Sequence, residues 1–222
     1  CFLVPTLFFG VHMAQQDIGN KVPLHTLKTS GEVRAFYDEW SSGGQYNKDM
    51  QDWNYTGPQE TVSIFSQYSL DPDIVVFDAG CGSGLVGKEL FRLGYHQIHG
   101  VDLSQRILDT VPDGLYKTLN QMDLNVPIDV LNDAFDAVLC VGTFTFSHVK
   151  SDALYEFTRI TKNGGLIAFT VNEGVFISEG FERTIKSLEE EGKWQRCVLC
   201  KSNYIKSKGV SAWLGLFRVV KS

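Results

Sequence analysis

The stretch VFDAGCGSGLVGKEL, residues 76–90, places three glycines within five positions, between an apolar run and a segment with helical spacing. The apolar run favours a buried strand, and the segment after the glycines favours a helix. Glycines at such a turn let a ligand approach the backbone closely. The sequence therefore predicts a ligand-binding turn, and two kinds of ligand are compatible with it: one that carries phosphates and one that carries none.

Strand-like and helix-like segments alternate along the chain on both sides of this turn. We expect strands at residues 74–80, 96–104, 114–120, 134–144 and 165–172, and helices at 83–94, 104–111, 151–165 and 178–192. Two more strands, at 194–205 and 211–220, have only a short turn between them, so they should form an antiparallel hairpin. The predicted fold class is α/β: a doubly wound, mostly parallel seven-stranded sheet of Rossmann-like type, with an antiparallel C-terminal edge hairpin.

The segment before the first strand is predicted to form helices that act as a lid. The predicted organisation is a poorly defined extension (1–29) followed by a single domain (30–222), which consists of N-terminal helices or lid (30–70) and an α/β core (71–222). Within the lid, SSGG interrupts a short helix that ends at Trp40, and a second helix follows Gly57 and Pro58. The apolar start, CFLVPTLFFGVH, is shorter than the ~20 residues that span a bilayer and lacks the basic region of a signal peptide, and Met13 is a candidate start.

Composition limits the possible partners. The chain has 20 Lys and Arg against 26 Asp and Glu, which argues against a broad nucleic-acid surface. The cysteines, among them Cys140 in an apolar run, are expected to be reduced thiols of a cytoplasmic protein. Cys197 and Cys200 lie in a predicted strand, where their spacing points them to opposite faces, so we expect no metal site. No membrane partner is expected either.

Two carboxylates near the glycine turn narrow the choice between ligands with and without phosphates. Asp102 follows the second predicted strand, 22 positions after Gly80, which is the spacing of an acid that holds ribose hydroxyls. Asp78 lies two positions before Gly80, where it would repel a pyrophosphate and attract an ammonium group. S-adenosylmethionine has a ribose, an ammonium and a sulfonium, and no phosphate. The alternative is a tight strand-to-helix turn that needs glycines only for its shape.

These segments resemble a known family. VFDAGCGSG followed by GVDLS resembles the first two signature segments of class I S-adenosylmethionine-dependent methyltransferases, and DAFDAVLCVGTF and ITKNGGLIAFTV resemble the segments of their fourth and fifth strands. More narrowly, the chain is similar to the methyltransferase-like proteins named for the Williams–Beuren chromosomal region, in which a YDxWA…YD stretch precedes the domain. FYDEWSSGGQYNKDM stands in that place here, with a longer gap between Trp40 and Tyr46 and with Asn47 where Asp is usual.

The resemblance implies a set of residues at the cofactor. They are Tyr37, Trp40, Tyr46, Asp78, Gly80, Cys81, Gly82, Asp102, Leu103, Asp123, Leu124 and Cys140. The glycines would admit the methionine part, and Asp78 would face its ammonium group directly or through water. Asp102 would bind both ribose hydroxyls, with Leu103 against the adenine. The three aromatic residues would cover the cofactor from the lid, although aromatic side chains also serve ordinary packing.

Methyl transfer from such a cofactor demands little of the protein's side chains, because the sulfonium is already an activated leaving group. The protein must place the acceptor in line and exclude water. The segment after the fourth predicted strand, GTFTFSHVK, lacks the Asn-Pro-Pro-Tyr of many amino-directed methyltransferases. His148 in this segment is a candidate general base or a structural histidine, and Phe144 and Phe146 could line an acceptor pocket or belong to the core.

Three functions remain open from the sequence. A methyltransferase acting on a small molecule leads, with a protein side chain as the second kind of acceptor. A domain that binds the cofactor without catalysis needs no particular residue and stays compatible. An NAD(P)-dependent oxidoreductase is favoured only by YIKSK, which has the Tyr-x-x-x-Lys spacing of short-chain dehydrogenases between two predicted strands. The acceptor atom and the oligomeric state do not follow from the sequence.

Overall fold

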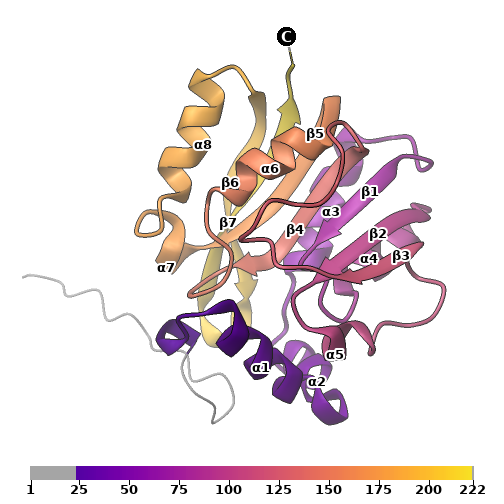
Figure 1. The fold of residues 1–222 in the computed structure, drawn as a ribbon, viewed down its shortest axis with the longest axis vertical. Coiled ribbons are helices and arrows are strands. Elements are labelled where there is room, and N and C mark those ends of the chain that lie inside the picture. Colours follow the sequence, from indigo (N-terminus) through magenta and orange to yellow (C-terminus); the bar gives the residue numbers. More distant parts are fainter. Residues whose placement is uncertain (1–23, 222) are drawn as a thin grey trace, which may run out of the picture.

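The computed structural model describes residues 24–221, and its centre is one seven-stranded sheet (Figure 1). The strands are β1 (Val75–Ala79), β2 (Gln97–Asp102), β3 (Thr118–Gln121), β4 (Phe135–Phe144), β5 (Thr161–Asn172), β6 (Trp194–Ile205) and β7 (Val210–Val219). Their order across the sheet is β3-β2-β1-β4-β5-β7-β6. Strands β1 to β5 are parallel, and β7 runs antiparallel to both β5 and β6. The predicted sheet and its C-terminal hairpin are therefore confirmed.

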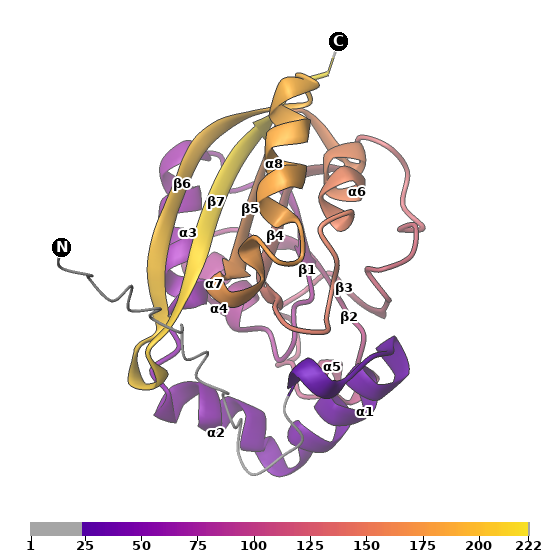
Figure 2. The same ribbon diagram turned by 90° about the vertical axis from the view of Figure 1, so that its left-hand side faces the viewer.

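Helices cover both faces of the sheet and one of its ends. They are α1 (Ser30–Trp40), α2 (Gln45–Asp52), α3 (Gly57–Tyr68), α4 (Leu85–Arg92), α5 (Gln105–Leu108), α6 (Ala153–Ile160), α7 (Glu173–Phe176) and α8 (Phe181–Glu190), with single turns at Leu24–Thr26, Ser42–Gly44 and Lys206–Lys208. Figure 2 shows α3 and α4 on one side of the sheet and α6 and α8 on the other. In both views, α1 and α2 cross below the ends of the strands.

Each face of the sheet has its own apolar core. On one side, Val62 and Phe65 of α3 and Leu90 of α4 pack against alternate residues of the central strands. On the other side, helices α6 and α8 bury a larger set that includes Phe157. Strands buried on both faces have near-continuous apolar sequences, which is why β1, β4 and β5 are conspicuous in the sequence. The lid has a third, small core around Trp40.

Several predicted boundaries were wrong in detail. The helix expected at 151–165 ends at Ile160, because Thr161 is already extended and pairs with Phe135 of β4. The same helix was expected to begin at Ser151, but its N-cap is Asp152, and the Ser151 hydroxyl accepts a hydrogen bond from Thr184. The sequence also gave no sign of α2 and α7, which are short. The break between the lid helices at SSGG is confirmed.

The C-terminal hairpin removes the sequence feature that favoured an oxidoreductase. Tyr204 lies on β6, and Lys208 lies in the turn before β7. The YIKSK segment therefore does not form the helical Tyr–Lys pair of a short-chain dehydrogenase. Cys197 and Cys200 also lie on β6, as predicted. In residues 24–221, no group of His, Cys, Asp or Glu side chains is arranged to hold a metal ion. Among the helices of that same part of the chain, none is long and apolar enough to cross a membrane.

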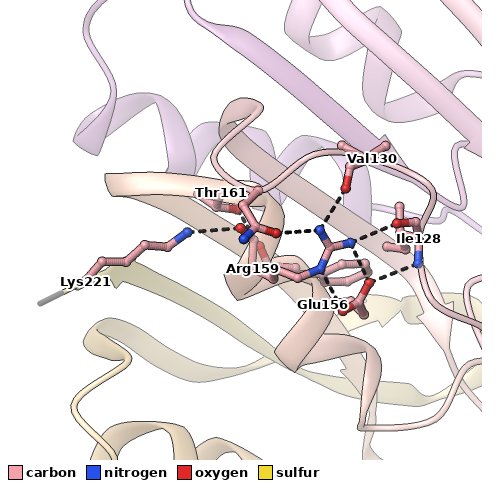
Figure 3. Close-up of polar contacts among 8 residues, drawn as sticks. Ile128, Val130, Glu156, Arg159, Thr161 and Lys221 are labelled. Carbon is pink, nitrogen blue, oxygen red and sulfur yellow. Dashed lines mark hydrogen bonds and ion pairs between the residues drawn. The ribbon is translucent and has the colours of Figure 1, made fainter.

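A single arginine ties the segment between β3 and β4 to the body of the protein (Figure 3). The guanidinium of Arg159 on α6 donates to the carbonyl oxygens of Ile128, at 2.8 Å, and Val130, at 2.7 Å. Glu156 binds the same guanidinium at 2.7 Å and accepts from the backbone N–H of Ile128 at 2.9 Å. The segment has no regular structure of its own, and at its other end Asp123 and Leu124 precede Asn125, whose side chain bonds to the backbone of His148 and Lys150.

Candidate functional site

A cavity of about 470 Å³ lies at the carboxyl ends of the strands, with residues of α1 and α2 in its wall. Of the residues singled out in the sequence, nine line this cavity: Tyr37, Tyr46, Gly80, Gly82, Asp102, Leu103, Asp123, Leu124 and His148. They come from segments separated by more than a hundred positions in the chain. The fold thus brings most of the predicted site together at one place, which is the usual ligand position of an open α/β sheet.

The glycine turn contributes two glycines with different roles. Both Gly80 and Gly82 have positive φ, at 73° and 54°. A Cβ atom on Gly80 would come within 2.2 Å of the Thr143 hydroxyl, so Gly80 allows the turn after β1 to pack against the end of β4. A Cβ atom on Gly82 would meet only Ile107 and the Tyr46 hydroxyl, both at 3.8 Å. Gly82 therefore leaves free space in the cavity, and that space suits a ligand close to the backbone.

Asp102 at the end of β2 is held rigidly beside this turn. Its Oδ2 accepts from the backbone N–H of Gly82 at 2.9 Å, and its Oδ1 accepts from the N–H of Ser104 at 3.0 Å. Burial raises the pKa of the carboxyl group, and the backbone hydrogen bonds oppose that rise. Each carboxylate oxygen can accept a further hydrogen bond. The geometry therefore fits the two hydroxyls of a ribose.

Asp78 lies near the turn but outside the cavity wall. Its side chain is fully buried, and its Oδ2 accepts from the hydroxyl of Tyr116 at 2.6 Å. Its Oδ1 has no hydrogen-bond partner among the described residues. Burial raises the pKa of Asp78 to about 7, and the Tyr116 hydrogen bond opposes that rise. A buried carboxylate oxygen without a donor fits a cationic ligand group nearby, such as an ammonium.

Trp40, Cys81 and Cys140 do not line the cavity. The indole N–H of Trp40 donates to Asp49 at 2.7 Å, and its ring is buried in the small core of the lid. The side chain of Cys140 is buried in the core beneath α6. The thiol of Cys81 packs against Gly100 of β2, because a Cβ atom on Gly100 would come within 2.9 Å of its sulfur. These positions give all three residues a packing role beside the site.

The lid is joined to the site by polar contacts from both of its helices. Asp38 of α1 accepts from the hydroxyl of Ser104 at 2.5 Å, next to Asp102. Asn47 of α2 accepts from the hydroxyl of Ser83, within the glycine turn, at 2.5 Å. The amide oxygen of Asn47 thus makes a contact that an Asp at the same position could also make. These contacts hold the lid helices against the wall of the cavity that contains the glycine turn.

The opposite wall contains His148, on the segment after β4. Its Nδ1 lies 2.5 Å from the carbonyl oxygen of Phe146, and its Nε2 lies 2.7 Å from the hydroxyl of Tyr37. A carbonyl oxygen only accepts, so Nδ1 carries the proton and Nε2 accepts from Tyr37. Burial lowers the pKa of His148 to about 4. The imidazole is therefore neutral at physiological pH.

Sequence reasoning missed part of the wall. The residues are Lys28, Thr29, Ser30, Val33, Ile107, Met122, Asn125, Val141, Gly142, Thr143, Thr145, Ser147, Val149, Lys150 and Glu179. The segment 141–145 could have been found, because it contains the carboxyl end of a predicted central strand, where ligands bind in such sheets. The residues before α1 and at its start carried no such signal.

Comparison of this sequence with known proteins shows to which family it is similar. A family model described as a methyltransferase domain matches residues 77–169. The protein named Methyltransferase-like protein 27, from Homo sapiens, is 32% identical to this chain over 201 residues, and the match covers 84% of this chain and 80% of that protein. The matched residues include the glycine turn, Asp102 and β4.

Solved structures share the fold. The [4+2]-cyclase SpnF has a TM-score of 0.66 at 13% identity, over 88% of this chain and 98% of that one. A chain from a complex that contains the Trm112 methyltransferase activator of Haloferax volcanii has a TM-score of 0.62 at 16% identity, over 83% of this chain and 98% of that one. At such identities the likeness concerns the fold alone, and the cyclase illustrates that one fold can serve different reactions.

Proposed function

Since this chain belongs to the class I S-adenosylmethionine-dependent methyltransferases, we propose that it transfers the methyl group of S-adenosylmethionine to a small molecule bound beneath α1. The family predicted from the glycine turn and Asp102 is thereby confirmed, together with the cofactor. The kind of acceptor, its place in the cavity and the roles of single residues belong to the proposal.

The cofactor half of the cavity is the wall that contains the glycine turn. Asp102 binds the ribose hydroxyls, and Gly82 leaves room for the methionine part. Asp123 and Leu124 lie at the adenine, on the segment that Arg159 anchors. The unpartnered oxygen of Asp78 supports a role in balancing the ammonium charge. The bound cofactor supplies a methyl group on a sulfonium, which needs no further activation.

The acceptor half lies between α1 and the segment after β4, and the covering of the cavity by α1 is the observation that carries this proposal. The Tyr37–His148 hydrogen bond joins the lid to that segment, so the cavity is closed over at this point. Its volume, about 470 Å³, lies in the range of small-molecule sites, about 300–1,000 Å³. Closure also excludes water from the reacting atoms. The net charge of −6 disfavours a nucleic-acid acceptor.

The test has two stages. Calorimetry with S-adenosylmethionine, S-adenosylhomocysteine and NAD should give binding of the first two and none of NAD. Methyl-labelled S-adenosylmethionine is then supplied with a protein-free, low-mass cell extract and, separately, with the protein fraction of the same cells. We expect label in the low-mass extract. Label only in protein would overturn the small-molecule acceptor, and cofactor binding without transfer to either fraction would overturn the proposed reaction.

A further inference from the structure

His148 is the only histidine among the described residues that line the cavity. It lies in the acceptor half, and its two ring nitrogens lie within hydrogen-bond distance of the Phe146 carbonyl oxygen and the Tyr37 hydroxyl. Its Nδ1–H is occupied by the carbonyl oxygen of Phe146, so the lone pair of the ring is at Nε2. With its pKa lowered to about 4 by burial, the ring keeps that lone pair free of a proton across the physiological range.

The segment around His148 is built to hold the ring in one orientation. The side chain of Asn125 donates to the carbonyl oxygen of His148 at 3.1 Å and accepts from the N–H of Lys150 at 3.0 Å. Ser147, just before the histidine, has φ of +61°, a conformation that residues other than glycine rarely adopt. Such local strain persists only where neighbouring contacts hold it, and it concentrates at functional sites. Nε2 is therefore fixed toward Tyr37.

Tyr37 lies between Nε2 and the rest of the cavity. It is on α1, it lines the cavity, and its hydroxyl donates to Nε2 at 2.7 Å. Burial holds the pKa of Tyr37 well above 10, so the hydroxyl does not ionise by itself. A hydroxyl that donates to a base still has lone pairs that accept from a second donor. Tyr37 can thus pass a proton to His148 as it receives one.

We propose that His148, acting through the Tyr37 hydroxyl, is the general base of the reaction, and that the acceptor atom is a hydroxyl oxygen. This inference rests on the proposed function. The acceptor O–H donates to Tyr37 Oη. As the acceptor atom bonds to the methyl carbon, the C–S bond breaks and its electron pair stays on sulfur. The acceptor proton moves to Tyr37 and the tyrosine proton moves to Nε2, which leaves an imidazolium.

The weak basicity of His148 suits this role. A hydroxyl oxygen that gains a methyl group from a sulfonium becomes strongly acidic, so a weak base can accept its proton late in the reaction. A methylated amine is an ammonium, which is too weak an acid to give its proton to such a base. A carboxylate or thioether acceptor has no proton to lose and would need neither residue. The imidazolium returns its proton to water when the lid opens. The chemistry of the pair therefore selects a hydroxyl acceptor.

The kinetic test uses His148→Ala and Tyr37→Phe, with methyl-labelled S-adenosylmethionine and the low-mass extract as probe. We expect both variants to lose about 10²–10⁴ in transfer rate, the usual contribution of a general base, while the dissociation constant of S-adenosylhomocysteine changes less than twofold. Added imidazole should restore transfer by His148→Ala in proportion to its concentration, which a structural role would not produce. The matched control is His96→Ala, at an exposed position before β2, and it should behave as the parent protein.

A second measurement needs no acceptor. Imidazole ¹⁵N NMR of the parent protein should show His148 as the neutral Nδ1–H tautomer down to about pH 5, and Tyr37→Phe should shift its Nε2 resonance. Titration of His148 near pH 6.5, or an Nε2–H tautomer, would overturn the proposal. So would a methylated product that is an amine, an ester or a sulfonium, or transfer that survives in His148→Ala. Absence of any product with the parent protein would overturn the proposed function itself, whereas product that His148→Ala forms as fast as the parent protein would overturn only this inference.

Discussion

At the level of single residues, Asp102 carries the most specific prediction. Asp102→Ala removes two charge-assisted hydrogen bonds to the ribose, which should cost about 3 kcal/mol or more and weaken cofactor binding at least about a hundredfold. It also leaves the N–H groups of Gly82 and Ser104 without their acceptor. Asp102→Asn keeps one acceptor oxygen, so its cofactor affinity should lie between those of the parent protein and Asp102→Ala. Calorimetry with S-adenosylhomocysteine measures the loss, and an unchanged dissociation constant would show that the ribose assignment is wrong.

Asp78 gives a prediction about pH. Its pKa of about 7 means that the carboxyl group is mostly protonated below that pH in the cofactor-free protein. An ammonium group prefers the ionised form, so binding must release the proton. Cofactor affinity should then fall about tenfold for each pH unit below about 7 and level off above it. Calorimetry at pH 6 in two buffers of different ionisation enthalpy should detect about one proton released.

The control for this pH effect is Asp78→Asn, which cannot titrate. It should bind S-adenosylhomocysteine more weakly at pH 8 and lose the pH dependence between 6 and 8. His148 stays neutral over that range, so it does not contribute. Affinity of the parent protein that is flat from pH 6 to pH 8 would mean that Asp78 does not face the ammonium group.

At the level of structural elements, two substitutions in the glycine turn should affect protein stability and cofactor binding to different extents. Gly82→Ala puts a residue with a side chain at positive φ, which should cost about 1–2 kcal/mol of unfolding free energy, and its methyl group occupies free cavity space. Gly80→Ala adds an overlap with Thr143 and should destabilise by about 3 kcal/mol or more. We expect Gly82→Ala to remain folded and bind no cofactor. Thermal melts and calorimetry measure both effects, and normal binding by Gly82→Ala would contradict the assignment.

The half-buried Arg159–Glu156 pair predicts a coupling between the stability of the segment after β3 and cofactor binding in the cavity. Arg159→Met removes the bonds to Ile128 and Val130 and should lower the unfolding free energy by about 2 kcal/mol. Hydrogen exchange should accelerate over residues 122–134, and cofactor affinity should fall severalfold because Asp123 and Leu124 lie on the same segment. Arg92→Met is the control, since the exposed Arg92–Glu89 pair contributes little. Loss of stability without a change in affinity would show that the anchor does not position the site.

These elements also show what a sequence can and cannot predict. The strands, the glycine turn and Asp102 are set by local apolar runs and by spacing, so they were found. The pairings that define the site are not local: Tyr37 bonds to His148, and Tyr116 bonds to Asp78. Their residues belong to different elements, so no spacing rule brings them together. Trp40 was assigned to the cofactor because nothing in the sequence shows that its indole binds Asp49 inside the lid.

At the scale of the whole molecule, the lid at residues 33–57 is predicted to order on cofactor binding. Most of its small core lies within the segment itself, with Leu85 and Phe146 of the main domain packed against it, and polar contacts such as Asp38–Ser104 and Asn47–Ser83 complete the contact. Opening should therefore cost less free energy than unfolding of the main domain, and a cofactor that touches Tyr46, beside Gly82, favours the closed form. Amide hydrogen exchange should slow across the lid when S-adenosylhomocysteine is added and stay unchanged in α8. Equal protection in both states would mean that the lid is a fixed wall.

The position of β7 between β5 and β6 has a consequence for biosynthesis. During synthesis β6 is made before its partner β7, and β5 keeps an open edge until β7 arrives to fill the gap. A chain in which residues 206–219 cannot yet fold thus presents unpaired strand edges, which favour chaperone binding and aggregation. The backbone of Tyr55 and Thr56 bonds to the end of β6. The lid therefore makes these contacts only after β6 is held in the sheet by β7. Substitutions that slow β7 insertion should lower the yield of the protein and leave the molecules that do fold fully active.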